Sequence, residues 1–338
     1  MEQTVRLSIV VPCYNEESSI GPLHAAVTAA AAALPDDEVE ILFVDDGSTD
    51  GTLAALRGLA ARDAAVRYVS FSRNFGKEAA MLAGLQRTNG DAVVLLDADL
   101  QHPPHLLPQM VALHKQGYDQ VVACRDRQGE PALRRIPARL FYRTVNRWVD
   151  VQLHDGAGDF RLLSRAVVDA LLSLPEYHRF SKGLFSWVGF STVTLTFRHE
   201  ARQAGTSTWS FGKLVNYALD GMLSFNNKPL RLAVYAGLLQ TLLATGYAAW
   251  VIVNALVEGV DMPGYATLIS AVIGMAGIQL MVLGVIGEYI GRIYYESKHR
   301  PHFLVRETDS RPTGRDQLTR PRARSDGDSP TAEVGTVA

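Results

Sequence analysis

The sequence has little of several features that would identify a function directly. Two cysteines in 338 residues are too few for a disulfide framework or a four-cysteine zinc site. Positive charge is not in excess, because 33 Lys and Arg face 35 Asp and Glu, so we expect no nucleic-acid partner. The nine histidines show no metal-ligand spacing. No G-x-G-x-x-G or Walker loop occurs, which disfavours dinucleotide oxidoreductases and P-loop NTPases.

Long uncharged stretches are present, however, near the C-terminal end. Residues 232–257 and 264–287 contain no Asp, Glu, Lys or Arg. At 1.5 Å per residue in a helix, each is long enough to cross a hydrocarbon core of about 30 Å. The connection at 258–263 is short, acidic and turn-forming. The sequence therefore predicts two transmembrane helices, paired as a hairpin, within residues 229–300.

The positive charge around these spans predicts their orientation. Five Lys and Arg residues flank the spans, and none lies in the connection: Lys228, Arg231, Arg292, Lys298 and Arg300. By the positive-inside bias, we expect a multi-pass protein of the cytoplasmic (inner) membrane with both termini in the cytoplasm. Residues 211–228 repeat apolar side chains at helical spacing. They predict a juxtamembrane amphipathic helix, although an ordinary helix covering the globular domain fits the pattern equally well.

The chain before the spans alternates apolar runs with helix-like stretches. Five runs rich in Val, Ile and Leu predict strands: Ser8–Pro12, Ile41–Asp45, Val66–Ser70, Val93–Asp97 and Gln120–Cys124. Four stretches between them predict helices: Ile20–Leu34, Thr52–Arg62, Lys77–Arg87 and Leu106–Gln116. The alternation predicts an α/β domain over residues 1–210, with a mostly parallel sheet flanked by helices. Residues 301–338 are polar and lack periodicity, so we expect a disordered tail.

Two acidic turns follow predicted strands, at the sheet edge where such folds bind ligands. Asp45 and Asp46 precede a Gly-Ser-Thr-Asp turn. A helix cap explains one such residue but not two adjacent carboxylates, so Asp46 is a candidate to bind a nucleoside. Asp97 and Asp99 are separated by one residue after another apolar run. Carboxylates in this arrangement can share a hard divalent cation with phosphate oxygens.

These turns belong to a set of motifs that occur in a fixed order. The set comprises Pro12–Glu17 (PCYNEE), Val44–Thr52 (VDDGSTDGT), Arg73–Lys77 (RNFGK), Asp97–Gln101 (DADLQ), Gly158–Leu162 (GDFRL) and Arg202–Ser207 (RQAGTS). It resembles glycosyltransferase family 2, which has the Rossmann-like GT-A fold. With the terminal hairpin and Gly287–Arg292 (GEYIGR), the chain is similar to the polyprenyl-phosphate branch, which includes bactoprenol glucosyltransferases and dolichol-phosphate mannosyltransferases.

The resemblance implies a role for each matching residue. Six would hold the nucleotide sugar: Pro12, Tyr14, Glu16, Asp46, Lys77 and Asp97. Asp97 and Asp99, with help from Gln101, would hold Mg²⁺ or Mn²⁺ on the diphosphate of the donor. Asp159 matches the position usually assigned as catalytic base, and Arg202 and Ser207 match a loop that closes over phosphate groups.

The implied reaction is inverting, metal-dependent transfer of a sugar, with UDP-glucose the first choice of donor, to a polyprenyl phosphate of the bactoprenol type. The acceptor phosphate has a second pKa of about 6 and is largely dianionic at pH 7, so Asp159 either takes a residual proton or orients the acceptor. Arginines after the fifth predicted strand are candidates to bind this phosphate, Arg125 and Arg139 above all. A solvated helix face with snorkelling arginines is the alternative.

Other readings stay open at this point. GDP-mannose is the second choice of donor and a modified UDP-pentose the third. A non-catalytic, membrane-anchored scaffold with the same fold would have no need for Asp97, Asp99 and Asp159 together. A transporter is disfavoured, because the two spans carry no charge. We expect contact with membrane lipid and a homo-oligomer, which would bring further helices together.

Overall fold

The structure, a computed structural model, describes residues 4–126, 157–198, 228–258 and 264–309. The chain divides into two compact units. The first comprises Met1–Leu100, Pro104–Pro108 and Pro301–Ala338, and the second Gln101–Pro103 and Gln109–Arg300. The chain therefore returns to the first unit after its C-terminal helices. The expected boundary at residue 210 lies outside the described residues, as does 211–227 of the expected juxtamembrane helix.

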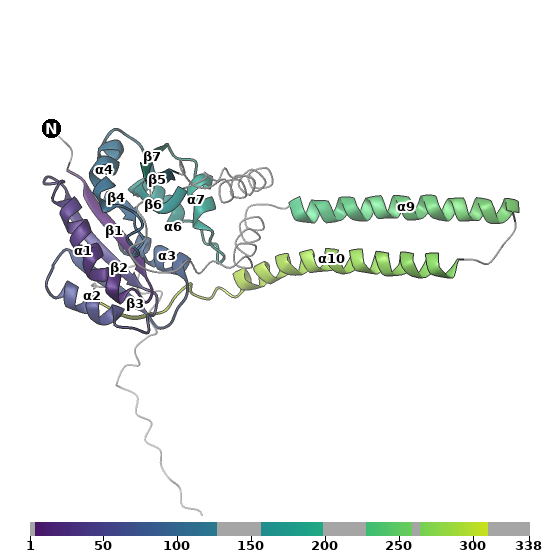
Figure 1. The fold of residues 1–338 in the computed structure, drawn as a ribbon, viewed down its shortest axis with the longest axis horizontal. Helices are drawn as coiled ribbons and strands as arrows, with labels where there is room; N and C mark the ends of the chain where they lie inside the picture. Colours follow the sequence, from purple (N-terminus) through teal and green to yellow (C-terminus); the bar gives the residue numbers. More distant parts are fainter. Residues whose placement is uncertain (1–3, 127–156, 199–227, 259–263, 310–338) are drawn as a thin grey trace, which may run out of the picture. The chain divides into compact units, whose positions relative to one another are not determined.

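The first unit contains a mostly parallel sheet with the strand order β4-β1-β2-β3-β8 (Figure 1). Its strands are β1 (Arg6–Cys13), β2 (Glu38–Asp45), β3 (Val66–Phe71), β4 (Ala92–Leu95) and β8 (Val305–Thr308). The first four pair in parallel, and β8 pairs antiparallel to β3. Nearly every residue of β1 is buried, as expected of a parallel strand covered on both faces. The predicted α/β class is confirmed.

Helices connect these strands in the predicted alternation. They are α1 (Glu17–Ala31), α2 (Thr52–Ala60) and α3 (Lys77–Arg87). After β4, a 3₁₀ turn η1 (Pro104–Leu106) leads into α4 (Leu107–Lys115), most of which belongs to the second unit. The bounds of α3 are those predicted. Because parallel strands run in one direction, the loops after β1, β2, β3 and β4 all leave the same edge of the sheet.

One expectation about the first unit differs from the structure. Residues 301–309 fall within the segment expected to be a disordered tail, yet Val305–Thr308 form β8. Phe303 is only 2% exposed. The segment is too short to show a periodic pattern, and its order comes from pairing with β3, which is more than 230 residues away in the sequence. Local sequence carries no signal of such a contact.

The second unit contains three further strands in the order β7-β5-β6. They are β5 (Gln120–Asp126), β6 (Ala157–Ser164) and β7 (Thr192–Arg198), of which β6 is antiparallel and β7 parallel to β5. Two helices follow β6: α6 (Arg165–Leu172) and α7 (Ser181–Trp187). Only β5 among these was predicted. Ser164 caps α6 by accepting a hydrogen bond from the Val167 amide at 3.4 Å.

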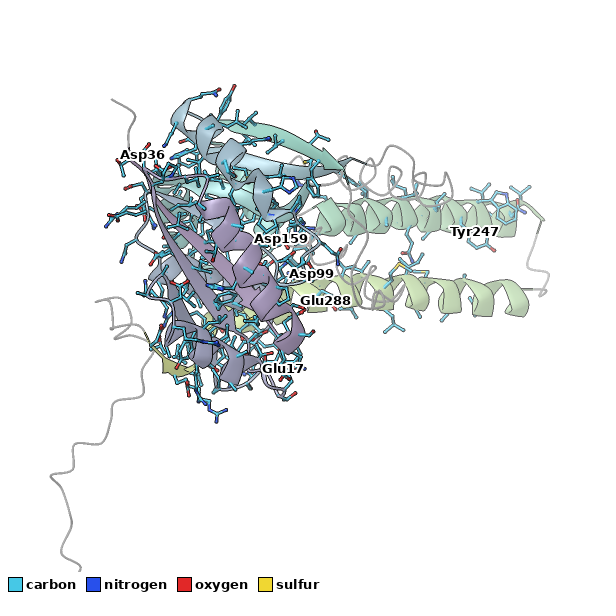
Figure 2. All side chains as sticks on the ribbon, turned by 60° about the vertical axis from the view of Figure 1, so that its left-hand side comes forward. Glu17, Asp36, Asp99, Asp159, Tyr247 and Glu288 are labelled. Atoms are coloured by element: carbon cyan, nitrogen blue, oxygen red, sulfur yellow. The ribbon has the colours of Figure 1, made fainter. Side chains whose placement is uncertain are left out.

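Two long helices, α9 (Lys228–Glu258) and α10 (Tyr265–Ser297), run side by side in opposite directions (Figure 1). They cover the two predicted spans. Large apolar side chains on both are exposed, for example Leu243 at 66% and Leu280 at 70%. Within the described residues, the segment Gly274–Ser297 is long and apolar enough to cross a membrane, with a mean hydropathy of 1.4. These features indicate membrane association. Figure 2 shows Tyr247 on α9 and Glu288 on α10.

The end of α10 makes specific contacts inside the second unit. The Tyr177 amide donates to Glu296 Oε1 at 2.7 Å. The rings of Tyr177 and Tyr295 stack with centroids 5.8 Å apart, and the His178 ring meets Tyr295 edge-on at 5.2 Å. Burial raises the pKa of the nearby Glu176 carboxyl. The segment after α6 therefore fixes the last turns of the second long helix.

Candidate functional site

A cavity of about 350 Å³ opens in the first unit at the edge where its parallel strands end. The four loops described above supply its walls. The lining residues are Pro12, Cys13, Tyr14, Glu16, Asp46, Asn74, Gly76, Lys77, Ala80, Asp97, Ala98 and Asp99. Every residue of the first unit that the resemblance assigns to the nucleotide or the metal is in this set. A cavity of this size is within the range of small-molecule sites.

The loops after β1 and β2 are joined by reciprocal hydrogen bonds. The Asn15 amide donates to Ser48 Oγ at 2.9 Å, and Asn15 Oδ1 accepts from the Thr49 amide at 2.9 Å. The Glu16 amide donates to Thr52 Oγ1 at 2.9 Å. Asn15 adopts a φ of 56°, a left-handed conformation that Asn tolerates better than most residues. These bonds fix the loop that carries Tyr14, whose side chain is 44% exposed.

The adjacent carboxylates of Asp45 and Asp46 hold different loops. Asp45 accepts from the Ser48 amide at 3.0 Å and from Ser70 Oγ at 2.7 Å, which ties its own turn to β3. Asp46 accepts from the Phe75 amide at 2.7 Å and the Gly76 amide at 2.9 Å, one on each oxygen. Asp46 thus positions the loop after β3 in addition to lining the cavity. Sequence reasoning predicted contact with a nucleoside but not this loop contact.

Burial changes the pKa values of two side chains in the cavity lining. It raises the pKa of the Asp46 carboxyl, and the hydrogen bonds from the Phe75 and Gly76 amides oppose that shift. Burial also raises the pKa of the Cys13 thiol well above its ordinary value, so Cys13 stays protonated at neutral pH. Both cysteines are buried thiols outside any disulfide, as expected of residues that fill the core.

The glycines of these loops allow close contacts. Gly47 has a φ of 67°, and a Cβ there would collide with the backbone of Arg73. Gly76 has a φ of 98° directly before α3. The loop after β3 can therefore lie against the Gly47 turn and still present its amides to Asp46.

Elsewhere in the lining of the cavity, a cation lies against a carboxylate. Lys77, the first residue of α3, places Nζ 2.5 Å from Asp97 Oδ1. Asp97 lies two residues beyond the end of β4, and the Leu96 amide between them donates to Val10 O at 3.0 Å. Asp99 is exposed and lines the same cavity (Figure 2 labels it). Lys77, Asp97 and Asp99 thus bring one positive and two negative side chains to the lining.

These residues fit a divalent cation only as part of a complex with a phosphate ligand. In the described part of the chain, no group of three or more His, Cys, Asp and Glu side chains is arranged to hold a metal ion. Two carboxylates can supply hard oxygen ligands, and Mg²⁺ is commonly bound by one or two carboxylates plus substrate phosphates. Asp97 already forms an ion pair with Lys77, so its carboxylate is partly neutralised by a cation of the chain itself.

The GDFRL motif lies within β6 in the second unit. Asp159 is half-buried there (Figure 2). Beside it, a Cβ on Gly158 would lie 2.8 Å from His102 Nε2, so this position needs glycine or a shifted histidine. The His102 ring packs against Phe160, with centroids 5.5 Å apart, and meets Phe197 edge-on at 6.2 Å. His102 is therefore a packing residue for the strand that carries Asp159.

Arg161 is a residue to which the sequence analysis assigned no role. Its side chain is buried, with 4% exposed, and its Nη2 donates to Gly158 O at 2.7 Å. The guanidinium lies 3.9 Å from the centroid of the Phe185 ring. Arg161 lies two residues beyond Asp159 on β6, in the part of the strand where the pairing with β5 shifts in register. Its presence in the motif was the available signal.

The structure describes only some of the remaining predicted site residues. Arg125 lies on β5, where it pairs with Phe197 of β7. Arg139, Arg202 and Ser207 lie outside the described residues. Gln101 belongs to the second unit, with Asp97 and Asp99 in the first. The roles of these five residues stay predictions.

Comparisons with known proteins show which families the chain matches. Residues 8–172 match the family described as Glycosyl transferase family 2, and residues 228–293 match the GtrB C-terminal hairpin. A protein of Bacillus subtilis (strain 168) named "Putative glycosyltransferase CsbB" is 48% identical over 303 residues, which are 90% of this chain and 92% of that protein. The "Bactoprenol glucosyl transferase" of Shigella phage SfV is 42% identical over 303 residues, 89% of this chain and 98% of that protein.

Solved structures resemble the chain more distantly. A mannosyltransferase from Pyrobaculum calidifontis, in complex with GDP-Man and Mn²⁺, matches with a TM-score of 0.43 at 17% identity, over 83% of this chain and 88% of that one. Glucosyl-3-phosphoglycerate synthase from Mycobacterium tuberculosis, in complex with Mn²⁺, UDP and glucosyl-3-phosphoglycerate, matches with a TM-score of 0.40 at 21% identity, over 64% of this chain and 76% of that one. At these TM-scores the likeness carries no inference about function.

Proposed function

Because the chain belongs to glycosyl transferase family 2, we propose that it transfers a sugar from a nucleotide-sugar donor to a polyprenyl phosphate at the cytoplasmic face of a membrane. The observation that carries the proposal is the cavity whose lining brings together the Lys77–Asp97 ion pair, Asp99, Tyr14 and Asp46. These side chains suit a ligand that carries both a diphosphate and a nucleoside. The relatives named bactoprenol glucosyl transferase support the lipid acceptor.

The donor would be held by residues of the cavity wall. Pro12, Tyr14 and Glu16 would contact the nucleoside, with Asp46 fixing the loop beside it. Lys77 would bind the diphosphate, because it already lies against Asp97 and phosphate oxygens offer it a stronger partner. Arg202 and Ser207 would close over the phosphates.

Asp97 and Asp99, assisted by Gln101, would hold Mg²⁺ or Mn²⁺ together with oxygens of the diphosphate. When bound, that cation would neutralise the charge that develops on the leaving group. The two carboxylates alone offer few ligands. The site would therefore hold the cation tightly only with the nucleotide present.

The chemical step would be a single displacement. An oxygen of the acceptor phosphate would form a bond to the anomeric carbon, while the bond from that carbon to the diphosphate oxygen breaks. The electron pair leaves with the nucleoside diphosphate, and attack opposite the leaving group inverts the anomeric centre. A phosphate dianion needs no base at pH 7, since its second pKa is about 6. Asp159 would thus orient the acceptor or take a residual proton.

The acceptor would reach the protein from the membrane. The exposed apolar side chains of α9 and α10 would contact lipid, with both chain termini in the cytoplasm. Arg125 and Arg139 would bind the acceptor phosphate. Pairing of the two helices with those of further copies, in a homo-oligomer, would bury more of this surface.

UDP-glucose is the proposed donor, with GDP-mannose the alternative. The test uses membranes that contain the full chain, a short-chain polyprenyl phosphate and a panel of radiolabelled nucleotide sugars. We expect label in the organic phase from UDP-glucose, and none when the lipid phosphate is omitted. If only GDP-mannose gives label in the organic phase, the donor is GDP-mannose and not UDP-glucose. No lipid-linked label from any donor would contradict the proposed function.

A further inference from the structure

The segment that follows the second long helix joins the donor-binding unit. Val305–Thr308 form β8 on β3, with the pairs Phe71–Val305, Ser70–Glu307 and Val69–Thr308. This segment lies beyond the two regions matched by known families, which end at residues 172 and 293. Because β8 runs antiparallel to β3, its beginning lies at the end of β3 that leads into the cavity. Its last residues lie at the opposite end.

Phe303, just before β8, is part of the core at the cavity end of β3. Its ring stacks on Phe71, with centroids 4.8 Å apart and planes 10° from parallel. The Arg87 guanidinium lies 5.4 Å from the centroid of the Phe303 ring. The next residue, Leu304, accepts a hydrogen bond through its carbonyl from the Ser72 amide at 2.9 Å. Phe303 and Leu304 thus hold the first residue after β3.

A continuous set of contacts leads from Phe303 to the cavity. The Phe71 ring meets Phe75 edge-on, with centroids 5.8 Å apart. The amides of Phe75 and Gly76 donate to the two oxygens of Asp46. Asp46 and Gly76 line the cavity. The loop at residues 72–76 is therefore held from one side by Asp46 and from the other by the Phe71–Phe303 stack.

We propose that Phe303 is a positioning residue for donor binding: by stacking on Phe71 it holds loop 72–76 so that the Phe75 and Gly76 amides meet Asp46 at the cavity wall. The inference rests on the proposed function for its ligand. Without Phe303, the Phe71 ring that supports Phe75 is no longer held in place, and the two amides lose their fixed position relative to the carboxylate.

The far end of the same strand supplies a matched control. Glu307 accepts hydrogen bonds from Arg57 Nε at 2.8 Å and Tyr68 Oη at 2.9 Å. The Tyr68 amide donates to Asp309 Oδ1 at 2.8 Å. These contacts stabilise β8 but none of these residues lines the cavity. Glu307→Gln should weaken the strand without disturbing loop 72–76.

The first measurement needs no ligand. Hydrogen exchange of the full chain in nanodiscs reports on the Phe75 and Gly76 amides directly. Phe303→Leu keeps an apolar side chain in the core but removes the stacked ring, and we expect it to speed exchange at both amides. Glu307→Gln should speed exchange in β8 and leave the two amides as in the wild type. Unchanged protection at Phe75 and Gly76 in Phe303→Leu would overturn the proposal.

The second measurement concerns the donor. Calorimetric titration with UDP and Mn²⁺ should show about tenfold weaker binding to Phe303→Leu than to the wild type, equivalent to about 1.4 kcal/mol. The KM for the nucleotide sugar should rise while kcat changes little, and Glu307→Gln should keep both. If Phe303→Leu and Glu307→Gln lose affinity for UDP equally, Phe303 contributes only to stability, and the proposal is overturned. A wild type that binds no nucleotide would instead contradict the proposed function, with the exchange result still valid for loop 72–76.

Discussion

The ammonium of Lys77 lies 2.5 Å from Asp97 Oδ1, so a cation of the chain itself occupies one oxygen of the carboxylate proposed to hold a metal ion. Two unit charges at about 4 Å interact by about 4 kcal/mol at an effective dielectric constant of 20. A divalent cation beside Lys77 would therefore be repelled until the ammonium finds another partner. The diphosphate of the donor supplies that partner, and donor and metal should bind together.

Lys77→Met tests this arrangement. Loss of a hydrogen bond to a charged phosphate costs about 1.5–3 kcal/mol, so UDP should bind about 10- to 100-fold more weakly. Uridine, which lacks the diphosphate, should bind as it does to the wild type. Calorimetric titrations with both ligands measure the difference, and Lys115→Met, an exposed lysine at the end of α4, is the control. An equal loss for uridine would place Lys77 at the nucleoside.

Asp46→Asn should weaken both the fold and the donor site. An amide keeps one acceptor for the Phe75 and Gly76 amides but turns an NH₂ group toward the other. Leaving a buried donor unsatisfied costs about 1–3 kcal/mol, which urea unfolding would detect. UDP affinity should fall in parallel. Asp36→Asn makes the same chemical change at an exposed position before β2 and should alter neither quantity (Figure 2). If Asp46→Asn is as stable as the wild type, Asp46 does not hold the loop after β3.

Gly158→Ala should slow transfer by displacing the strand that carries Asp159. The added Cβ would lie 2.8 Å from His102 Nε2, closer than side chains tolerate. We expect kcat to fall with little change in KM for the donor. The double variant with His102→Ala removes the clash and should recover much of the loss, although the smaller side chain leaves space against Phe160. A double variant no better than Gly158→Ala would mean that His102 is not the cause.

The stability of the first unit should depend on pH through Glu307. The hydrogen bond from Arg57 holds the pKa of Glu307 below its ordinary value. The folded state then binds this proton less readily than the unfolded state. The stabilisation is therefore present above the ordinary pKa of about 4.3 and is lost as the pH falls through the lowered value. In this acid range, the free energy of unfolding of Glu307→Gln should change less with pH than that of the wild type. An equal pH dependence in the two proteins would contradict the assignment.

The sequence predicted the part of the fold in which local pattern and long-range structure agree. The bounds of α3 were predicted correctly, because its apolar residues fall at helical spacing between Gly76 and the end of the helix. The predicted strands β1, β2, β3 and β5 are present with small differences in their ends. Predicted β4 ran to Asp97 but ends at Leu95, because the chain turns to present Asp97.

The parts that were missed depend on distant contacts. The strand β8 has four residues and follows a long apolar helix, so nothing near it in the sequence indicates that it pairs with β3. The role of Asp46 in holding the Phe75 and Gly76 amides is also nonlocal, since a carboxylate after a strand predicts a ligand or a cap equally well. Arg161 lay within a recognised motif, but its contact with Phe185 could not be seen before the strand and α7 were placed.

The central claim is that the carboxylates of Asp97 and Asp99 hold a divalent cation on which sugar transfer to a polyprenyl phosphate depends. The most direct measurement is lipid-linked label formed from UDP-glucose by the full chain in membranes, before and after chelation and with Mg²⁺ or Mn²⁺ restored. Transfer by the wild type should stop when chelator is added and return when the metal is restored. Asp36→Asn should transfer like the wild type, whereas Asp99→Asn should show no transfer although its unfolding curve is normal. Full transfer in the chelated wild type, or in Asp99→Asn, would contradict this claim.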